Sequence, residues 1–203
     1  MDQIFAVRVG DKYGPEYEEY LNSKLGDVTF IRVSMPQFIR QWNKIRLFQW
    51  PVKGPICVID VDIELVNDYQ ELFEFPCERG EFVSIPAWWK DTDKPGYSLN
   101  GGFYKFWPQD TKYIYDEFMN NHRKWTTHYV ENGTTVGPVN GEQYFVEDMV
   151  KQRLELKLVP EEWVQRGING KYLDDGEVKL VHHSFTSQEQ HDPHSRHNQE
   201  HSL

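Results

Sequence analysis

The chain has 203 residues, enough for one domain with a substantial hydrophobic core. It contains 22 lysine and arginine residues and 32 aspartate and glutamate residues, which gives a formal charge of -10. This negative charge argues against a surface that binds along the phosphates of a nucleic acid. With only two cysteines, Cys57 and Cys77, the chain lacks the disulfide framework of a small secreted protein. No nucleic-acid partner is therefore expected, and a reducing compartment, the cytoplasm, is the expected location.

The first half of the chain alternates strand and helix patterns. Apolar runs predict strands at 4–9, 28–33 and 56–59, and helical periodicity predicts helices at 16–25 and 36–50. Strands that alternate with helices are typical of an α/β fold with a largely parallel sheet. No stretch approaches the length needed to cross a bilayer, so no transmembrane segment is expected.

The second half keeps both kinds of element but loses the strict alternation. Strands are predicted at 82–85, 101–106 and 156–159, and helices at 111–121 and 141–151. We therefore expect a single α/β domain whose central sheet is mixed, mostly parallel, and flanked by helices.

The end of the chain differs in composition from the rest. Residues 186–203 are rich in glutamine, histidine, serine and asparagine and nearly devoid of apolar side chains. Such a segment cannot bury enough apolar surface to fold by itself. We expect a domain at 1–185 followed by a flexible tail or a linker to further domains of a longer polypeptide.

Two aspartates follow the predicted strand at 56–59. In an extended chain, Asp60 and Asp62 project to the same side. They stand at the carboxyl end of a buried strand, where open α/β sheets bind ligands, and paired carboxylates are typical of a Mg²⁺ or Mn²⁺ site. Two alternatives stay open: a solvated pair in a turn, or the Asp-x-Asp-x-Thr loop of haloacid-dehalogenase phosphatases. Glu64 at the threonine position, and the long segment before the motif, argue against the phosphatase.

Five segments together resemble the GT-A glycosyltransferase superfamily, in particular the glycogenin-like family 8 and the small glycosyltransferase domains encoded by large algal viruses. In chain order they are Val-Arg-Val-Gly-Asp-Lys-Tyr-Gly at 7–14, Trp-Asn-Lys-Ile-Arg-Leu-Phe at 42–48, Cys-Val-Ile-Asp-Val-Asp-Ile-Glu-Leu at 57–65, Leu-Asn-Gly-Gly-Phe-Tyr at 99–104 and Gly-Glu-Gln-Tyr-Phe at 141–145. The resemblance covers about residues 4–185 and rests on the order of the motifs, because each is short. It implies a metal-dependent enzyme that moves a sugar from a nucleotide diphosphate, with a UDP-sugar as the expected donor, to a glycan or other hydroxyl acceptor.

The resemblance also implies a metal site. Asp60 and Asp62 would hold Mn²⁺ or Mg²⁺, and His182 would be a third ligand, with the adjacent His183 as its competitor. Either histidine, read without the resemblance, is a residue at the end of a strand that pairs with an acid. The chain departs from the family here, since the usual Lys-Pro-Trp after the histidine is missing, and this leaves the cationic clamp on the diphosphate in doubt.

The segments that resemble donor-binding motifs predict the contacts to the nucleotide and its sugar. The implied donor-binding residues are Val7, Arg8, Val9, Gly10, Tyr13, Lys44, Val61, Gly101 and Gly102. Arg8 and Lys44 are the candidates for the remaining positive charge, with ordinary ion pairing as the alternative. The glycines either let the backbone approach the donor or serve as turn residues.

Three residues are candidates for the reaction itself. Asn100 would hydrogen-bond the donor sugar, and Glu142, at the aspartate position of the Gly-Asp-Gln motif, would orient the sugar or act as general base. Asp148 is the reserve candidate, with a solvated helix face as its alternative. A base implies inversion whereas family 8 implies retention, so the stereochemical course stays open.

The acceptor site is predicted from Trp88 and Trp89, whose indole faces could stack on a sugar or pack in the core. A non-catalytic, lectin-like module that binds carbohydrate is the alternative from another functional class. It differs from the enzyme in needing neither nucleotide nor metal.

Overall fold

The computed structural model of the chain describes residues 2–10, 13–34, 38, 40–87, 97–131, 141–168, 172–173 and 175–184. The strands are β1 (Gln3–Val9), β2 (Val28–Val33), β3 (Ile56–Ile59), β4 (Ile63–Leu65), β5 (Glu81–Pro86), β6 (Leu99–Phe106), β7 (Glu155–Leu158), β8 (Val164–Ile168) and β9 (Leu180–Ser184). The α-helices are α1 (Pro15–Leu25), α2 (Gln70–Glu74), α3 (Pro108–Glu131) and α4 (Gly141–Arg153), and the 3₁₀ segments are η1 (Arg40–Gln49) and η2 (Glu161–Trp163).

Two sheets form the framework. The larger has six strands in the order β2-β1-β3-β6-β5-β7, in which β6 runs antiparallel to both neighbours and the other strands share one direction. The smaller has the order β4-β9-β8, with β4 antiparallel and β8 parallel to β9. The predicted α/β fold with a mixed, largely parallel sheet is therefore confirmed.

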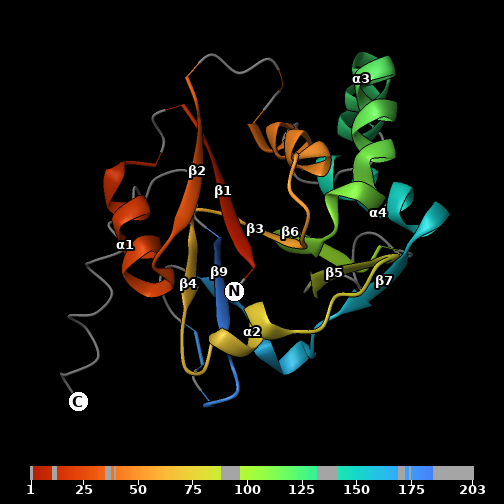
Figure 1. The fold of residues 1–203 in the computed structure, drawn as a ribbon. Helices are drawn as coiled ribbons and strands as arrows, with labels where there is room; N and C mark the ends of the chain where they lie inside the picture. The colour runs from red at the N-terminus through yellow and green to blue at the C-terminus, as the bar shows by residue number, and fades with distance from the viewer. Residues whose placement is uncertain are drawn as a thin grey trace.

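Both faces of the large sheet are buried, which explains why its central strands read as continuous apolar runs. Phe5 and Val58 point into one core, with η1, α3 and α4, while Ile4 and Cys57 point into the other, with α1, β4 and β9. In Figure 1, α1 and the group of η1, α3 and α4 lie on opposite sides of β1 and β3. The two faces of β1 and β3 are therefore covered by different sets of elements.

Several elements differ from the sequence prediction. The helix expected at 36–50 is a 3₁₀ segment from Arg40 in the part that the structure describes, and the helix expected at 111–121 runs from Pro108 to Glu131. That long helix contains a kink at Asn121, whose backbone is non-helical. The strands β4, β8 and β9 were not predicted, because each is short and mixes polar with apolar residues instead of forming an apolar run.

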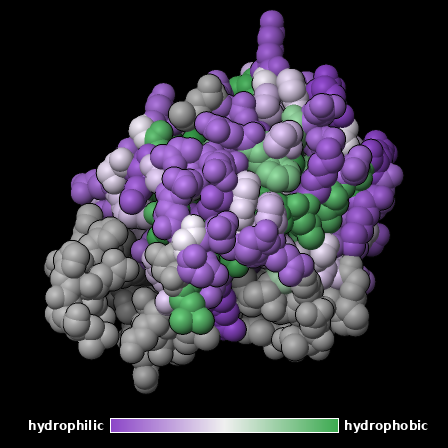
Figure 2. All heavy atoms as spheres, turned by 90° about the horizontal axis from the view of Figure 1, so that it is seen from below, coloured by the Kyte–Doolittle hydropathy of each residue, from purple (hydrophilic) through white to green (hydrophobic). Residues whose placement is uncertain are grey.

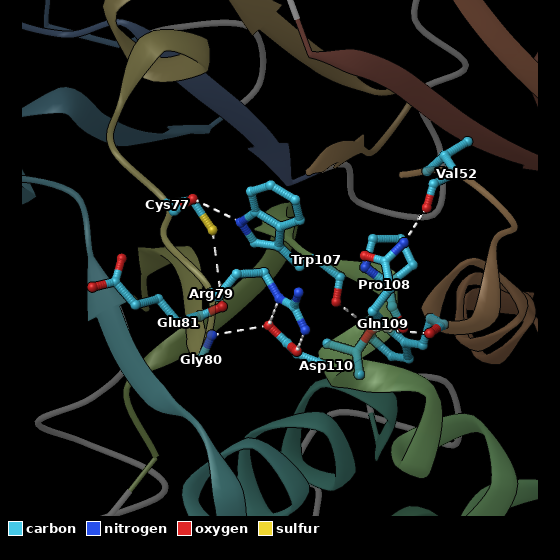
Figure 3. Close-up of polar contacts among 11 residues, drawn as sticks. Val52, Cys77, Arg79, Gly80, Glu81, Trp107, Pro108, Gln109 and Asp110 are labelled. Atoms are coloured by element: carbon cyan, nitrogen blue, oxygen red, sulfur yellow. Dashed lines mark hydrogen bonds and ion pairs between the residues drawn. The ribbon is translucent and has the colours of Figure 1, made fainter. Parts of the chain in front are cut away.

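The start of α3 is anchored to the turn before β5 (Figure 3). Asp110 accepts hydrogen bonds from Arg79 Nε at 2.7 Å and from Gly80 N at 2.9 Å, and Trp107 Nε1 donates to the Cys77 carbonyl at 2.9 Å. A carboxylate in the first turn also interacts favourably with the positive end of the helix dipole. These contacts hold α3 against the large sheet.

Hydrophilic side chains cover most of the face seen in Figure 2, and apolar ones form scattered patches between them. Among the described residues, no helix is both long and apolar enough to pass through a membrane. The predicted boundary between 1–185 and the tail 186–203 lies outside the described residues, as do Trp88 and Trp89.

Candidate functional site

Two carboxylates and one imidazole converge beyond the carboxyl end of β3. Asp60 follows the last residue of that strand, and its backbone N donates to the Gly102 carbonyl at 3.0 Å. One side-chain ligand atom each from Asp60, Asp62 and His182 lies within 4.8 Å of the others, and each residue is partly exposed. The three residues predicted to bind a metal ion are therefore brought together, although His182 is more than a hundred residues from the aspartates.

Tyr13 orients the second aspartate. Its hydroxyl donates to Asp62 Oδ2 at 2.6 Å. Burial, and then the charge of the Asp62 carboxylate, raise the pKa of Tyr13 well above its ordinary value. The hydroxyl therefore keeps its proton and stays a donor, which ties the segment after β1 to the site.

Lys44 brings a buried positive charge to the first aspartate. Its ammonium lies 2.5 Å from Asp60 Oδ1 and donates to the Gly101 carbonyl at 2.7 Å, and its side chain is 4% exposed. Burial lowers the pKa of Lys44, but the Asp60 and Glu142 carboxylates outweigh it, so the net pKa is raised. Burial likewise raises the pKa of Asp60, but Lys44 and His182 outweigh it and lower that pKa to about 2. The pair is therefore ionised at neutral pH.

The two adjacent histidines of β9 have different partners. His182 Nε2 lies 3.6 Å from Asp60 Oδ2, whereas His183 Nε2 lies 2.8 Å from Glu64 Oε2. Successive side chains of a strand point to opposite faces, which explains the division. His182 is thus the histidine of the cluster, and the competing assignment to His183 is not supported.

The cluster fits a hard divalent cation by its donor set, since carboxylate oxygens and a neutral imidazole suit Mn²⁺. Gly102 leaves room for the imidazole, because a Cβ there would lie 2.7 Å from His182 Cδ2. Burial lowers the pKa of His182, but Asp60 and Asp62 outweigh it, so the net pKa is raised. A metal ion would compete with a proton for this ring.

The segment at the start of β6 forms one wall of the site. Asn100 is 2% exposed, and its Oδ1 accepts a hydrogen bond from Gly102 N at 2.7 Å. Gly101 N donates to Gln143 Oε1 at 3.2 Å, which links β6 to the first turn of α4. The backbone of Gly101 therefore lies beside Lys44, and that of Gly102 lies beside His182.

Glu142 is a buried carboxyl group close to the cluster. It is 2% exposed, and its Oε1 accepts a hydrogen bond from Tyr104 Oη at 3.3 Å. Burial is the largest influence on its pKa and raises it to about 7, with a further rise from Asp60, while Lys44 opposes the change. A carboxyl group of this kind exchanges its proton near neutral pH, as a general acid or base must.

The predicted cation Arg8 has a different partner. Its guanidinium pairs with Glu18 of α1 at 3.0 Å, and Arg32 of β2 pairs with the same carboxylate. Val7 lies in the core beside η1, and Gly10 has a positive φ of 65° at the end of β1. The remaining predicted donor-binding residues are Val9, half-buried, and Val61, buried.

The reserve candidate Asp148 is held by two tyrosines. Tyr97 and Tyr129 both donate to its Oδ2, at 2.8 Å and 2.6 Å. Tyr129 belongs to α3 and Tyr97 lies just before β6, and the described hydrogen bonds of Asp148 include none to the aspartate cluster. The geometry favours Glu142 over Asp148 as the carboxyl group of the site.

Sequence reasoning did not assign two residues that the structure brings to the site. Gln143 contacts the backbone of Gly101, and Tyr104 contacts Glu142. Both lie inside segments that carry the family resemblance, so their motifs were the available signal. The directions in which side chains leave α4 and β6 bring Gln143 and Tyr104 to the site, and the sequence motifs do not show these directions.

Solved structures were compared once this geometry was clear. The chain is similar to galactosyltransferase LgtC in complex with donor and acceptor sugar analogues, at 10% identity and a TM-score of 0.57, covering 90% of this chain and 87% of that one. It is similar to the glycosyltransferase GlyE of Streptococcus pneumoniae, at 11% identity and a TM-score of 0.52, covering 81% of this chain and 46% of that one. Mouse xyloside xylosyltransferase 1 matches at 12% identity and a TM-score of 0.53, covering 89% and 96%.

The chain spans about half the length of the two GlyE structures that it matches, at 46% and 55%. At these identities the likeness shows the fold alone, and the chain shares the GT-A fold of these glycosyltransferase structures. No family model and no curated protein matches the sequence.

Proposed function

We propose that the chain is a metal-dependent glycosyltransferase that moves a sugar from a nucleotide diphosphate, a UDP-sugar, to a hydroxyl group of a glycan or other acceptor. The observation that carries the proposal is the convergence of Asp60, Asp62 and His182 at the carboxyl end of β3 within a GT-A fold. An LgtC structure of this fold holds donor and acceptor sugar analogues, which supports the substrate class.

The proposed metal site consists of the Asp60 and Asp62 carboxylates and the His182 imidazole, with Mn²⁺ as the expected ion. A bound divalent cation supplies Lewis-acid stabilisation of the negative charge that develops on the leaving diphosphate. Tyr13 holds Asp62 in place through its hydroxyl. The nucleotide would lie against the neighbouring residues of β1 and its following turn.

Lys44 is the proposed second source of positive charge. Its ammonium is buried, protonated, and held between Asp60 and the Gly101 carbonyl. A charge that is fixed in a low-dielectric site before the reaction stabilises a developing anion without reorganisation. Lys44 therefore supplies, from η1, positive charge beside the proposed metal site, and Arg8 remains paired with Glu18.

Asn100 and Glu142 are proposed to act on the sugars. Asn100 lines the donor sugar from β6, and Glu142, whose pKa of about 7 is set mainly by burial, orients the donor or accepts the proton of the acceptor hydroxyl. The acceptor is proposed to stack on Trp88 or Trp89, which belong to the segment between β5 and β6.

The proposal is tested by isothermal titration calorimetry with UDP in the presence and absence of Mn²⁺. We expect binding that requires Mn²⁺ and is lost in Asp60→Asn and Asp62→Asn. Asp116→Asn is the matched control, since that aspartate pairs with Lys112 on the exposed surface of α3. Binding of UDP that does not require Mn²⁺, or that persists in both variants, would refute the assignment of the metal site to Asp60 and Asp62.

A second measurement separates the enzyme from the lectin-like alternative. A panel of nucleotide sugars is incubated with the protein and Mn²⁺, and release of the nucleoside diphosphate is followed. The enzyme consumes at least one donor and stops when EDTA is added. A protein that binds glycans without nucleotide or metal, and consumes no donor, belongs to the lectin-like class.

A further inference from the structure

We propose that the buried pair of Glu64 and His183 is a positioning device that sets the register of β9 against β4 and so selects His182, not His183, as the histidine that faces the metal ion. The inference rests on the proposed function, because it assumes that Asp60, Asp62 and His182 hold a metal ion. It assigns a role to two buried polar residues that the proposed reaction does not use.

The two strands concerned carry the metal site. β4 begins directly after Asp62, and in the antiparallel register of β4 and β9 its first residue, Ile63, is opposite His182. The distance between the second aspartate and the histidine therefore depends on how these two strands are aligned. β4 has three residues, so its few backbone hydrogen bonds define the register weakly.

Glu64 and His183 add a specific contact across this short pairing. Glu64 is opposite Val181, so the contact to His183 is diagonal, and its Oε2 lies 2.8 Å from His183 Nε2. Glu64 is 8% exposed and His183 is 2% exposed. A polar group buried away from water costs about 1 to 3 kcal/mol when its partner is removed, so this contact penalises every other alignment.

The third strand of the small sheet is shaped to receive the same ring. Gly167 of β8 is opposite His183, and a Cβ at that position would lie 2.3 Å from His183 Nδ1 and 2.6 Å from its Cε1. The imidazole therefore packs on bare backbone of β8. A glycine on one neighbouring strand and a carboxylate on the other together form a slot that only one residue of β9 occupies.

The consequence follows from the alternation of side chains along a strand. A shift of β9 by one residue would turn every side chain to the other face. In one direction it would bring His183 to the position of His182, and the next residue, Ser184, to the position of His183. Because both residues are histidines, the metal cluster alone distinguishes the two alignments poorly. The slot formed by Glu64 and Gly167 distinguishes them, since a serine would take the slot in the shifted alignment and Glu64 would lose its imidazole partner.

The test compares Mn²⁺ binding in Glu64→Leu, which removes the acceptor, with Glu64→Gln, which keeps an amide able to hydrogen-bond His183. The dissociation constant is measured by Mn²⁺ electron paramagnetic resonance, and the nitrogen modulation in the electron spin echo reports a coordinated imidazole. We expect Glu64→Leu to weaken Mn²⁺ binding by about 10- to 100-fold and to reduce the nitrogen modulation, the range typical for groups that orient metal ligands. Glu64→Gln is expected to restore both readouts.

Glu71→Gln is the matched control, because Glu71 pairs with Lys179 immediately before the same strand. Its Mn²⁺ constant and nitrogen modulation should equal those of the wild type. Circular dichroism establishes that each variant is folded at the assay temperature. If Glu64→Leu is unfolded, Gly167→Ala takes its place, because the added methyl group would press on His183 from β8.

The outcomes separate the inference from the proposed function. If the wild type binds no Mn²⁺, or if His182→Phe leaves the nitrogen modulation unchanged, the proposed metal site is wrong. If the wild type binds through His182 and folded Glu64→Leu and Gly167→Ala bind equally well with the same modulation, the positioning role is wrong while the metal site stands.

Discussion

Replacing Glu142 with glutamine is expected to remove a pH dependence from the stability of the protein. In the folded chain, burial raises the pKa of Glu142 from its ordinary value of 4.5 to about 7. The folded state therefore holds a proton on this group over an interval in which the unfolded state has already lost it. Stability falls with rising pH wherever the folded state binds more protons, so Glu142 stabilises below pH 4.5 and loses that contribution as the pH passes 7.

The magnitude follows from the size of the pKa difference. One pKa unit corresponds to about 1.36 kcal/mol, so the rise in the pKa of Glu142 contributes about 3 kcal/mol to the free energy of unfolding at low pH. Roughly 2 to 3 kcal/mol of this contribution is lost between pH 5 and pH 8. Glutamine keeps a neutral, hydrogen-bonding side chain of nearly the same shape. The free energy of unfolding of Glu142→Gln, relative to wild type, should therefore increase by this amount from pH 5 to pH 8.

The assay is urea unfolding followed by tryptophan fluorescence at several pH values, in EDTA so that no metal ion contributes. Glu19→Gln is the control, since Glu19 is exposed on α1 and should leave the pH dependence unchanged. If the difference between Glu142→Gln and wild type is the same at pH 5 and pH 8, the burial of Glu142 does not hold its proton and the reasoning fails.

Two further substitutions test the packing of the site and of its support. Gly102→Ala should weaken Mn²⁺ binding about tenfold or more, since the added Cβ would meet His182 at 2.7 Å, whereas the milder Gly101→Ala should stay near the wild-type value in the same titration. Equal constants for the two variants would contradict the geometry. Trp42→Ala should cost about 3 to 5 kcal/mol in urea unfolding, because Trp42 is fully buried and stacks on Phe118 at 5.1 Å. A loss below about 1 kcal/mol would show that the core there is loosely packed.

The strands of the large sheet were predictable from their apolar runs, which in β3, β5 and β6 are buried along the whole strand. The runs at 4–9, 28–33 and 56–59 correspond to β1, β2 and β3 within one residue at each end. The small sheet was not predictable, since β4, β8 and β9 are short, contain polar residues and have no apolar run of their own. The 3₁₀ geometry of η1 was also missed, because the sequence pattern of a 3₁₀ helix is not distinguishable from that of an α-helix.

Contacts between distant segments were equally inaccessible. Lys44 donates to the carbonyl of Gly101, 57 residues away, and the sequence marked Lys44 only as one of two candidate cations. Arg8 was the second candidate, and it pairs with Glu18 because α1 packs beside β1 and β2. Which of two cations reaches the aspartates depends on how helices pack on the sheet.

The sequence by itself determined where the two carboxylates of the proposed metal site lie. Four buried apolar residues followed by Asp60 and Asp62 place two carboxylates at the end of a strand, whatever the rest of the chain does. Only the tertiary structure decided which histidine joins them, since His182 and His183 are neighbours of the same type. The alignment of β9 between β4 and β8 turns His182 toward Asp60 and His183 toward Glu64, and that alignment exists only after the strands have assembled.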